Sequence, residues 1–338
     1  MGKSADRYAN SRTPYRPSQL SRDPKSRADK LEILFIPLAL VAGGLLAVQA
    51  GANAQLSKAV GSPFAATLLQ LSVGAIVLLL ITVLTGTMPA LLVIRRAEWW
   101  HAVGGTASAF YVVSTILLFP RLGAVVSVGL FIAGQMLASF ALDTFGWLGL
   151  PEAGLQAGPS LGMLVVLAGA TLIVLGQKGT ADNLAPSKPG WIGLALLAGA
   201  VLPVQGAVNA LLRHDLGGTP FAVGTISFLV ATLAMAAVLL AALAWTKTAR
   251  PRLAGVSSMP WWGWLGGFAG ATYVTTVFTA IPVIGAAAAV GLTVAGQQVA
   301  SIFVDTFGWF RLPQRLVSGM RLAGVVLLLA GCIIIKAL

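Results

Sequence analysis

The chain has 338 residues, of which 57% are hydrophobic and only 9% are charged, and its mean hydropathy is +0.87. Because such a small number of charged residues cannot cover the surface of a soluble protein, the composition excludes a soluble fold. It predicts an integral membrane protein with many spans. The net charge of +12 would suit a nucleic-acid-binding protein, but eight of the 22 Lys and Arg residues lie in the first 30 positions. The others are scattered between apolar runs, as orientation charges are in membrane proteins, and we expect no nucleic acid as a partner.

The first segment, residues 1–31, is polar and rich in Ser, Arg and Pro. It contains no short apolar core followed by a cleavage site, so it does not resemble a cleavable signal peptide. We predict a disordered, basic N-terminal tail.

Apolar runs occupy most of the remaining sequence. Crossing a bilayer takes about 20 residues of helix, or about 17 in a tight fit. In lipid the backbone must satisfy its own hydrogen bonds, so runs of this length are expected to be helices and the fold class to be all-α. Ten such runs are present, at residues 33–54, 64–85, 101–119, 122–142, 159–177, 190–211, 220–245, 262–280, 284–304 and 318–336.

The second five runs repeat the first five. Residues 133–151 and 295–313 are identical at 12 of 19 positions, and both contain Gly-Gln followed by Asp-Thr-Phe-Gly-Trp. The repeat extends to Gln49 and Asn53, which match Gln205 and Asn209. Agreement of this kind indicates an internal duplication.

The duplication defines the domain organisation. We predict a first five-helix repeat at 32–178, a polar linker at 179–189 and a second five-helix repeat at 190–338. Because each repeat has an odd number of spans, the second must enter the membrane in the opposite orientation. Inverted-topology repeats are typical of transporters, whose substrate site lies near the bilayer midplane where the repeats meet.

The orientation of the chain rests on conflicting charges. Ten spans place both termini on one side of the membrane, and the basic tail favours the cytoplasmic side because its translocation is unfavourable. The loops taken without the tail favour the opposite orientation. We expect cytoplasmic termini in the cytoplasmic membrane.

Paired amides are the first candidate site residues. Gln49 and Asn53 are four residues apart and share one helix face, as do Gln205 and Asn209. Amides within apolar spans are costly unless they have partners, so they usually face the bundle interior or a cavity. They are interpreted either as substrate-binding residues or as hydrogen bonds between helices.

Four further polar residues recur in both repeats. Gln135 and Gln297 each follow a glycine that allows close helix approach, and they are expected either to bind substrate or to join helices. Tyr111 and Tyr273 add phenol groups, which can contact substrate or pack between helices.

The acidic residues Asp143 and Asp305 occupy equivalent positions at the ends of two spans. Proton coupling requires a carboxylate that titrates, which makes both candidates. The alternative is structural, with each aspartate bonding backbone groups of the following turn while Phe and Trp anchor the helix end at the lipid headgroups. No carboxylate lies in the middle of a span, so direct proton exchange through an embedded acid is not supported.

These motifs resemble the YdcZ-like family of the drug/metabolite transporter superfamily. The resemblance rests on Val-Gln-Ala-Gly-Ala-Asn at 48–53, Val-Gln-Gly-Ala-Val-Asn at 204–209, and the two Gly-Gln and Asp-Thr-Phe-Gly-Trp elements. It covers residues 32–336 and implies the superfamily fold, in a fused two-copy form, and a transport role. It implies no particular substrate.

The leading functional prediction is a secondary transporter of a small organic metabolite or drug that works by alternating access. The alternative is a lipid carrier or a non-transporting scaffold of the same fold. An enzyme is not expected, since the sequence has no P-loop, no His-Glu-x-x-His motif and no acidic or histidine cluster, and we expect neither a cofactor nor a metal. The expected partners are a small-molecule substrate and membrane lipids, with a monomer as the functional unit and a homo-oligomer left open.

Overall fold

The computed structural model describes residues 24–149, 152–176, 188–245, 250–257, 259–284 and 286–337, and every regular element in these ranges is a helix. Most of the predicted tail and of the predicted linker therefore lies outside the described residues. The long helices are α1 (Pro24–Val60), α2 (Pro63–Leu84), α4 (Gly105–Leu122), α5 (Ala124–Phe145), α6 (Ala157–Leu175), α7 (Lys188–Asp215), α8 (Pro220–Trp245), α9 (Leu265–Ile284), α10 (Ala286–Phe307) and α11 (Gly319–Ala337).

Short helices connect the long ones. A five-residue helix, α3 (Met88–Leu92), follows α2, and two 3₁₀ helices, η1 (Val93–Arg96) and η2 (Trp99–Gly104), lead into α4. In the second half, η5 (Leu253–Val256) and η6 (Trp261–Trp264) lead into α9. The tryptophan pairs Trp99–Trp100 and Trp261–Trp262 thus lie in 3₁₀ turns.

Seven helices of the described residues are long and apolar enough to cross a membrane, and they belong to α1, α2, η2 with α4, α5, α6, α7 and α8. The apolar stretch Gly319–Ile335 of α11 is shorter. Helices α9 and α10 contain residues whose side chains are not described. The structure is therefore that of an all-helical membrane protein, and the count of ten spans remains a prediction.

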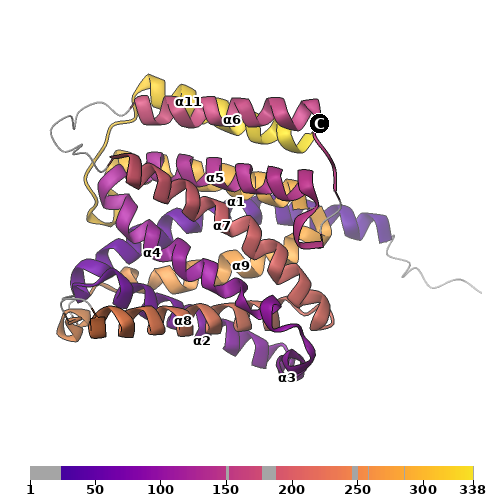
Figure 1. The fold of residues 1–338 in the computed structure, drawn as a ribbon, viewed down its shortest axis with the longest axis vertical. Coiled ribbons are helices and arrows are strands. Elements are labelled where there is room, and N and C mark those ends of the chain that lie inside the picture. Colours follow the sequence, from indigo (N-terminus) through magenta and orange to yellow (C-terminus); the bar gives the residue numbers. More distant parts are fainter. Residues whose placement is uncertain are drawn as a thin grey trace, which may run out of the picture.

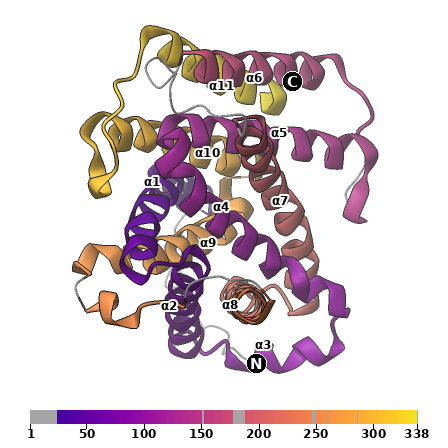
Figure 2. The ribbon, with the colours of Figure 1, turned by 60° about the vertical axis from the view of Figure 1, so that its left-hand side comes forward.

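The helices form layers that are easy to follow in two views. Helices α6 and α11 lie side by side at one edge, and α2 and α8 pair at the opposite edge (Figures 1 and 2). Between these edges α1 packs on α10 and α9, while α7 packs on α5 and α4. The contacts of α1 are thus matched by those of its repeat counterpart α7.

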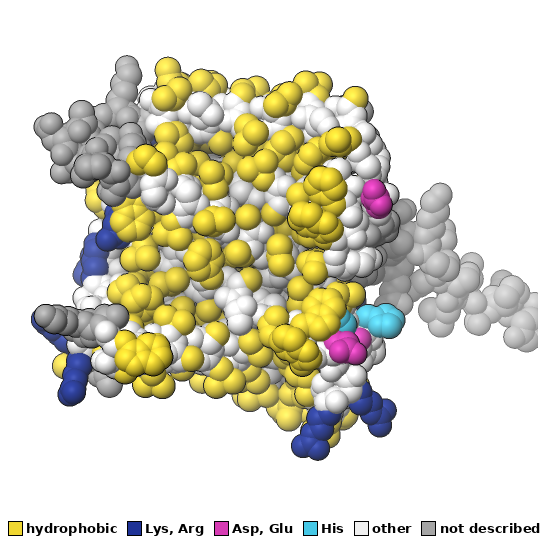
Figure 3. All heavy atoms as spheres, in the orientation of Figure 1, with side chains coloured by type: hydrophobic (Ala, Val, Ile, Leu, Met, Phe, Trp, Pro, Cys, Tyr) yellow, Lys and Arg dark blue, Asp and Glu magenta, His cyan; other side chains and the backbone are white. Residues whose placement is uncertain are grey.

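The outer surface suits a lipid environment. Hydrophobic side chains cover most of the visible face, and charged side chains gather toward its two ends (Figure 3). Large apolar residues are strongly exposed along the spans, including Ile76, Leu164 and Leu233. Such a surface is unfavourable in water and favourable against hydrocarbon.

Glycines allow the central helices to touch. A Cβ on Gly43 of α1 would lie 1.9 Å from the Thr293 carbonyl oxygen of α10, and one on Gly199 of α7 would lie 2.0 Å from that of Phe131 in α5. The two contacts are equivalent under the repeat. Small residues permit this backbone approach in membrane helices, where packing drives association.

The repeated Asp-Thr-Phe-Gly-Trp motif ends α5 and α10. Gly146 and Gly308 have φ of 62° and 63°, which glycine adopts readily and which commonly ends a helix. Each glycine is followed by a one-turn 3₁₀ helix, η3 (Trp147–Gly149) or η7 (Trp309–Arg311). The motif is therefore a helix terminus in both halves.

Candidate functional site

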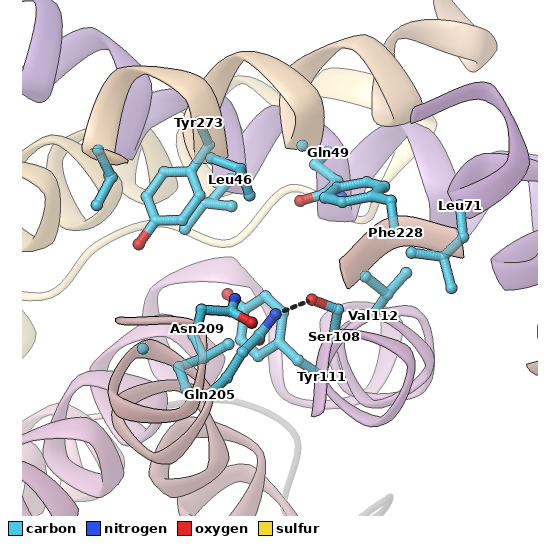
Figure 4. A pocket seen from close by; sticks show the side chains of 15 residues that line it. Leu46, Gln49, Leu71, Ser108, Tyr111, Val112, Gln205, Asn209, Phe228 and Tyr273 are labelled. Atoms are coloured by element: carbon cyan, nitrogen blue, oxygen red, sulfur yellow. Dashed lines mark hydrogen bonds between the residues drawn. The ribbon is translucent and has the colours of Figure 1, made fainter. Parts of the chain in front are cut away.

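A cavity of about 110 Å³ lies in the centre of the bundle, among α1, α2, α4, α7, α8 and α9. Its walls combine residues of both halves, because α1 packs on α9 and α7 packs on α4. Figure 4 shows Gln49 and Tyr273 on one side of the cavity and Gln205, Asn209 and Tyr111 on the other. These five are among the eight residues predicted to bind substrate.

The second-half amides are held by serine hydroxyls. Gln205 Nε2 donates to Ser108 Oγ of α4 at 2.6 Å (Figure 4) and to Ser227 Oγ of α8 at 3.3 Å. Asn209 Nδ2 donates to Ser227 Oγ at 3.4 Å. Asn209 is only 4% exposed, and its Oδ1 has no hydrogen-bond partner among the described residues.

The first-half amide Gln49 has different surroundings. Under the repeat, Ser108 corresponds to Gly270 and Ser227 corresponds to Gln70. Gly270 leaves room for Gln49, whose Nε2 lies 2.7 Å from the position of a Cβ there. Gln70 donates instead to the Gly266 carbonyl oxygen at 3.3 Å, so Gln49 lacks the counterpart of the bond between Gln205 and Ser227 within the described part of the chain. Serine hydroxyls therefore hold the Gln205 side chain in place, whereas Gln49 lacks the equivalent serines. Both amides line the same cavity.

Three predicted substrate-binding residues do not line the cavity. Asn53 is fully buried against Gly266, and neither atom of its amide has a partner among the described residues. Gln297 donates to the Tyr111 hydroxyl oxygen at 2.9 Å, which places it behind a lining residue. Gln135 is 8% exposed, and within the described ranges its Nε2 has no partner.

Neither aspartate lines the cavity. Asp305 is 2% exposed and accepts hydrogen bonds from the backbone N–H groups of Ala124 at 2.7 Å and Val125 at 3.0 Å, at the start of α5. It also pairs with Arg321 of α11 at 2.9 Å. Asp305 therefore caps a helix of the other half, whereas the structural interpretation from sequence placed its bonds in the turn that follows it.

Arg315 lies beside this group, in the segment between η7 and α11. It donates to the carbonyl oxygens of Pro120 at 3.2 Å and Arg121 at 3.1 Å. Burial lowers the pKa of the Arg315 guanidinium, and Asp305 acts in the opposite direction. Arginine stays protonated in proteins, so two cations face one carboxylate here. Asp143 has no arginine at the positions equivalent to Arg315 and Arg321, which are Ala153 and Pro159.

Several cavity residues were missed from sequence. Ser108 and Gly206 line the cavity, and Ser227 lies behind it as the partner of two lining amides. Ser108 could have been found from the sequence because it is a polar residue in an apolar helix, and its counterpart in the second repeat, Gly270, is not polar. Arg321 could also have been found from the sequence, because it is a charged residue within the last apolar run.

None of the described residues that line the cavity is an Asp, Glu, Lys, Arg or His. The described residues also contain no group of three or more His, Cys, Asp or Glu that could hold a metal ion. Amides, hydroxyls and apolar side chains can bind and orient a solute, but they supply no strong acid, base or metal ligand.

Comparisons with known proteins agree with this architecture. A family model described as "Putative inner membrane exporter, YdcZ" matches residues 34–172 and 190–334. Inner membrane protein YdcZ of Escherichia coli (strain K12) is 28% identical over 80 residues, which are 24% of this chain and 53% of that protein. The match thus spans about half the length of that relative.

A solved crystal structure shares the fold. It is 20% identical in sequence and aligns with a TM-score of 0.52 over 88% of this chain and 95% of its own. The description of the matched family names an inner membrane exporter, which is a kind of transporter and not of enzyme, and it agrees with a multi-pass inner membrane protein. Because the family model matches one range in each repeat and most of the sequence, the chain belongs to the YdcZ family of the drug/metabolite transporter superfamily.

Proposed function

We propose that the protein is a secondary transporter that moves a small organic solute across the inner membrane by alternating access between two inverted five-helix halves. The observation that carries the proposal is the central cavity, to which both repeats contribute the same residue types, Gln49 with Gln205 and Tyr111 with Tyr273. A site at the meeting point of inverted repeats can be exposed to either side when the halves rock.

The pairing of helices supports an inverted repeat of ten spans. The contacts of α1 with α9 and α10 recur as contacts of α7 with α4 and α5, and α2 with α8 and α6 with α11 each pair with their own counterparts. One operation that exchanges the halves explains all of these pairs. Since one chain supplies both halves of the cavity, we propose a monomer as the functional unit.

The same layout supports an orientation with both termini on one side. We propose the cytoplasm for that side because the basic residues of the first 30 positions resist translocation. The Asp305 contacts support a structural rather than a proton-carrying role, so the proposal assigns no proton transfer to either aspartate.

The size of the cavity speaks against the lipid-carrier alternative. Pockets for drug-sized ligands measure roughly 300–1,000 Å³. The cavity of about 110 Å³ is smaller, and a membrane lipid is larger than most drugs. Gly206 is exposed, however, so the cavity is not sealed on every side.

Alternating access can be tested before the solute is known. In a Cys332→Ala background, the variant Gly206→Cys places one thiol on the cavity wall, while Val166→Cys places one in the buried contact of α6 with α11. In oriented proteoliposomes, a membrane-impermeant maleimide is expected to label Gly206→Cys when added on either side and Val166→Cys from neither. Labelling of Gly206→Cys from one side only contradicts the proposal.

Solute movement is the second test. Counterflow in proteoliposomes, screened with a broad panel of metabolites and drugs, is expected to find at least one transported solute. The variant Gln49→Ala should slow its transport by about fivefold, the value of one hydrogen bond. Gln55→Ala is the matched control, since Gln55 is a buried amide of the same helix that does not line the cavity. If no solute moves, the protein is not a transporter.

A further inference from the structure

We propose that His101 and Asp215 form a lock that keeps the central cavity closed at one end of the bundle. Their hydrogen bond joins η2 of the first half to the end of α7 in the second half, and it has to break when the two halves part at that end. The lock rests on the proposed function, since it requires that the halves move apart, and it adds the residues that control one of the two openings.

Two contacts join the halves where α4 and α7 form the cavity wall. Gln205 Nε2 of α7 donates to Ser108 Oγ of α4 at 2.6 Å (Figure 4). One turn further along α7, a Cβ on Gly104 would lie 2.7 Å from Asn209 Oδ1, so the backbone that leads into α4 lies directly against this amide. Gln205 and Asn209 both line the cavity. The contact between α7 and the first half therefore begins at the cavity and continues away from it.

The third contact lies at the end of α7, six residues beyond Asn209. There the Nδ1–H of His101 donates to Asp215 Oδ2 at 2.5 Å. His101 is 8% exposed, and Trp100 packs edge-on against its ring. A hydrogen bond to a carboxylate is stronger than one between neutral groups, and burial reduces the competition from water. Of the three contacts, this one is therefore the most costly to break.

Other charged groups near the pair compete weakly for Asp215. His214 lies 3.9 Å from Asp215 Oδ1, but its side chain is 93% exposed, and exposed pairs contribute little. Arg95 and Arg96 belong to η1, which also packs on α7, and both are exposed. Neither forms an ion pair with Asp215 in the described part of the chain. The Asp215 carboxylate is thus directed at His101.

The equivalent contact in the other copy lacks the lock. Under the repeat, His101 corresponds to Gly263 and Asp215 corresponds to Ala59, and neither has a polar side chain. Helix η5 covers this end of α1 instead, where a Cβ on Gly255 would lie 2.0 Å from the Ala59 carbonyl oxygen. The contacts of α7 with η2 and of α1 with η6 are therefore held by different means, and the lock acts on the first of them.

The position of the lock in the chain gives the side that it closes. In the proposed order of ten spans, η2 leads into the third span and Asp215 ends the sixth. Both residues therefore lie on the side of the membrane that holds the two termini. Breaking the lock is expected to open the cavity toward that side and not toward the other.

The test uses the Gly206→Cys protein in the Cys332→Ala background and compares the rates at which an impermeant maleimide labels it from each side of oriented proteoliposomes. His101→Leu is expected to raise the rate from the side of the termini by about tenfold or more, the effect of one hydrogen bond to a charged group. The rate from the other side should not rise. Asp215→Asn should raise the first rate by only about threefold, because an amide oxygen still accepts from the imidazole.

Two further variants separate the lock from a general loss of stability. The double variant His101→Leu with Asp215→Leu should match His101→Leu alone, since each removes the same bond. Thr82→Val is the matched control, because Thr82 and Thr225 form a buried bond at 2.8 Å that also joins the halves, between α2 and α8. This control should leave both rates unchanged.

The outcomes distinguish the lock from the transport proposal. An equal rise from both sides, a rise from the opposite side alone, or no change in either rate with both His101→Leu and Asp215→Asn overturns the lock and leaves transport standing. Additive effects of His101→Leu and Asp215→Leu also overturn it, because two residues that act through one bond cannot add. Labelling of the Gly206→Cys protein from one side only, before any change at His101, overturns alternating access and the lock with it.

Discussion

Replacing Asp305 with alanine is expected to lower the free energy of unfolding by about 3–5 kcal/mol, the cost of breaking a buried ion pair from one side. The substitution leaves Arg321, which is 2% exposed, without its carboxylate. It also removes the acceptor of the Ala124 and Val125 N–H groups at the start of α5. Both losses occur at a buried site, where an unpaired polar group costs more free energy than at the surface.

The measurement is unfolding in mixed detergent micelles, with Arg311→Ala as the control, because Arg311 is an exposed cation near the same end of α10. The control should change stability by less than about 1 kcal/mol. The double variant Asp305→Asn with Arg321→Met should be more stable than Asp305→Ala, since it removes the buried Arg321 charge together with the carboxylate, while Arg315 keeps the Pro120 and Arg121 carbonyl oxygens. Equal effects of Asp305→Ala and Arg311→Ala would show that the Asp305 carboxylate does not hold Arg321 and the start of α5 as described.

Replacing Gly43 with alanine is expected to disrupt the packing of α1 on α10, whereas the same change at Gly44 is expected to be tolerated. The new Cβ at Gly43 would lie 1.9 Å from the backbone oxygen of Thr293, but at Gly44 the nearest atom is 3.5 Å away. A backbone atom cannot turn aside as a side chain can, so the helices must separate. Overpacking typically costs about 1–3 kcal/mol, and a clash with backbone belongs at the upper end.

The repeat provides a second copy of this test. Gly199→Ala should destabilise the protein as much as Gly43→Ala, because its Cβ would lie 2.0 Å from the Phe131 carbonyl oxygen. Gly193→Ala, with nothing within 4 Å, is the control on the same helix. Thermal unfolding of the four variants in one detergent compares them directly. A stable Gly43→Ala protein would mean that α1 and α10 are not in the contact described.

The sequence determined the class of the protein and the relation of its parts. Lipid leaves the backbone no alternative to helix, so long apolar runs could be assigned from composition. Duplication made residues recognisable in pairs, and five of the eight predicted substrate-binding residues, Gln49, Tyr111, Gln205, Asn209 and Tyr273, do lie together on one cavity. Whether they bind a solute remains a prediction.

Tertiary structure decided how equivalent residues differ. Asn53 and Asn209 match in sequence, yet only Asn209 lines the cavity. Asp143 and Asp305 share a motif, yet only Asp305 has Arg321 beside it, because the arginine comes from a helix that diverged between the copies. A side chain's partners lie on other helices, so spacing along one helix predicts its face but not what that face meets.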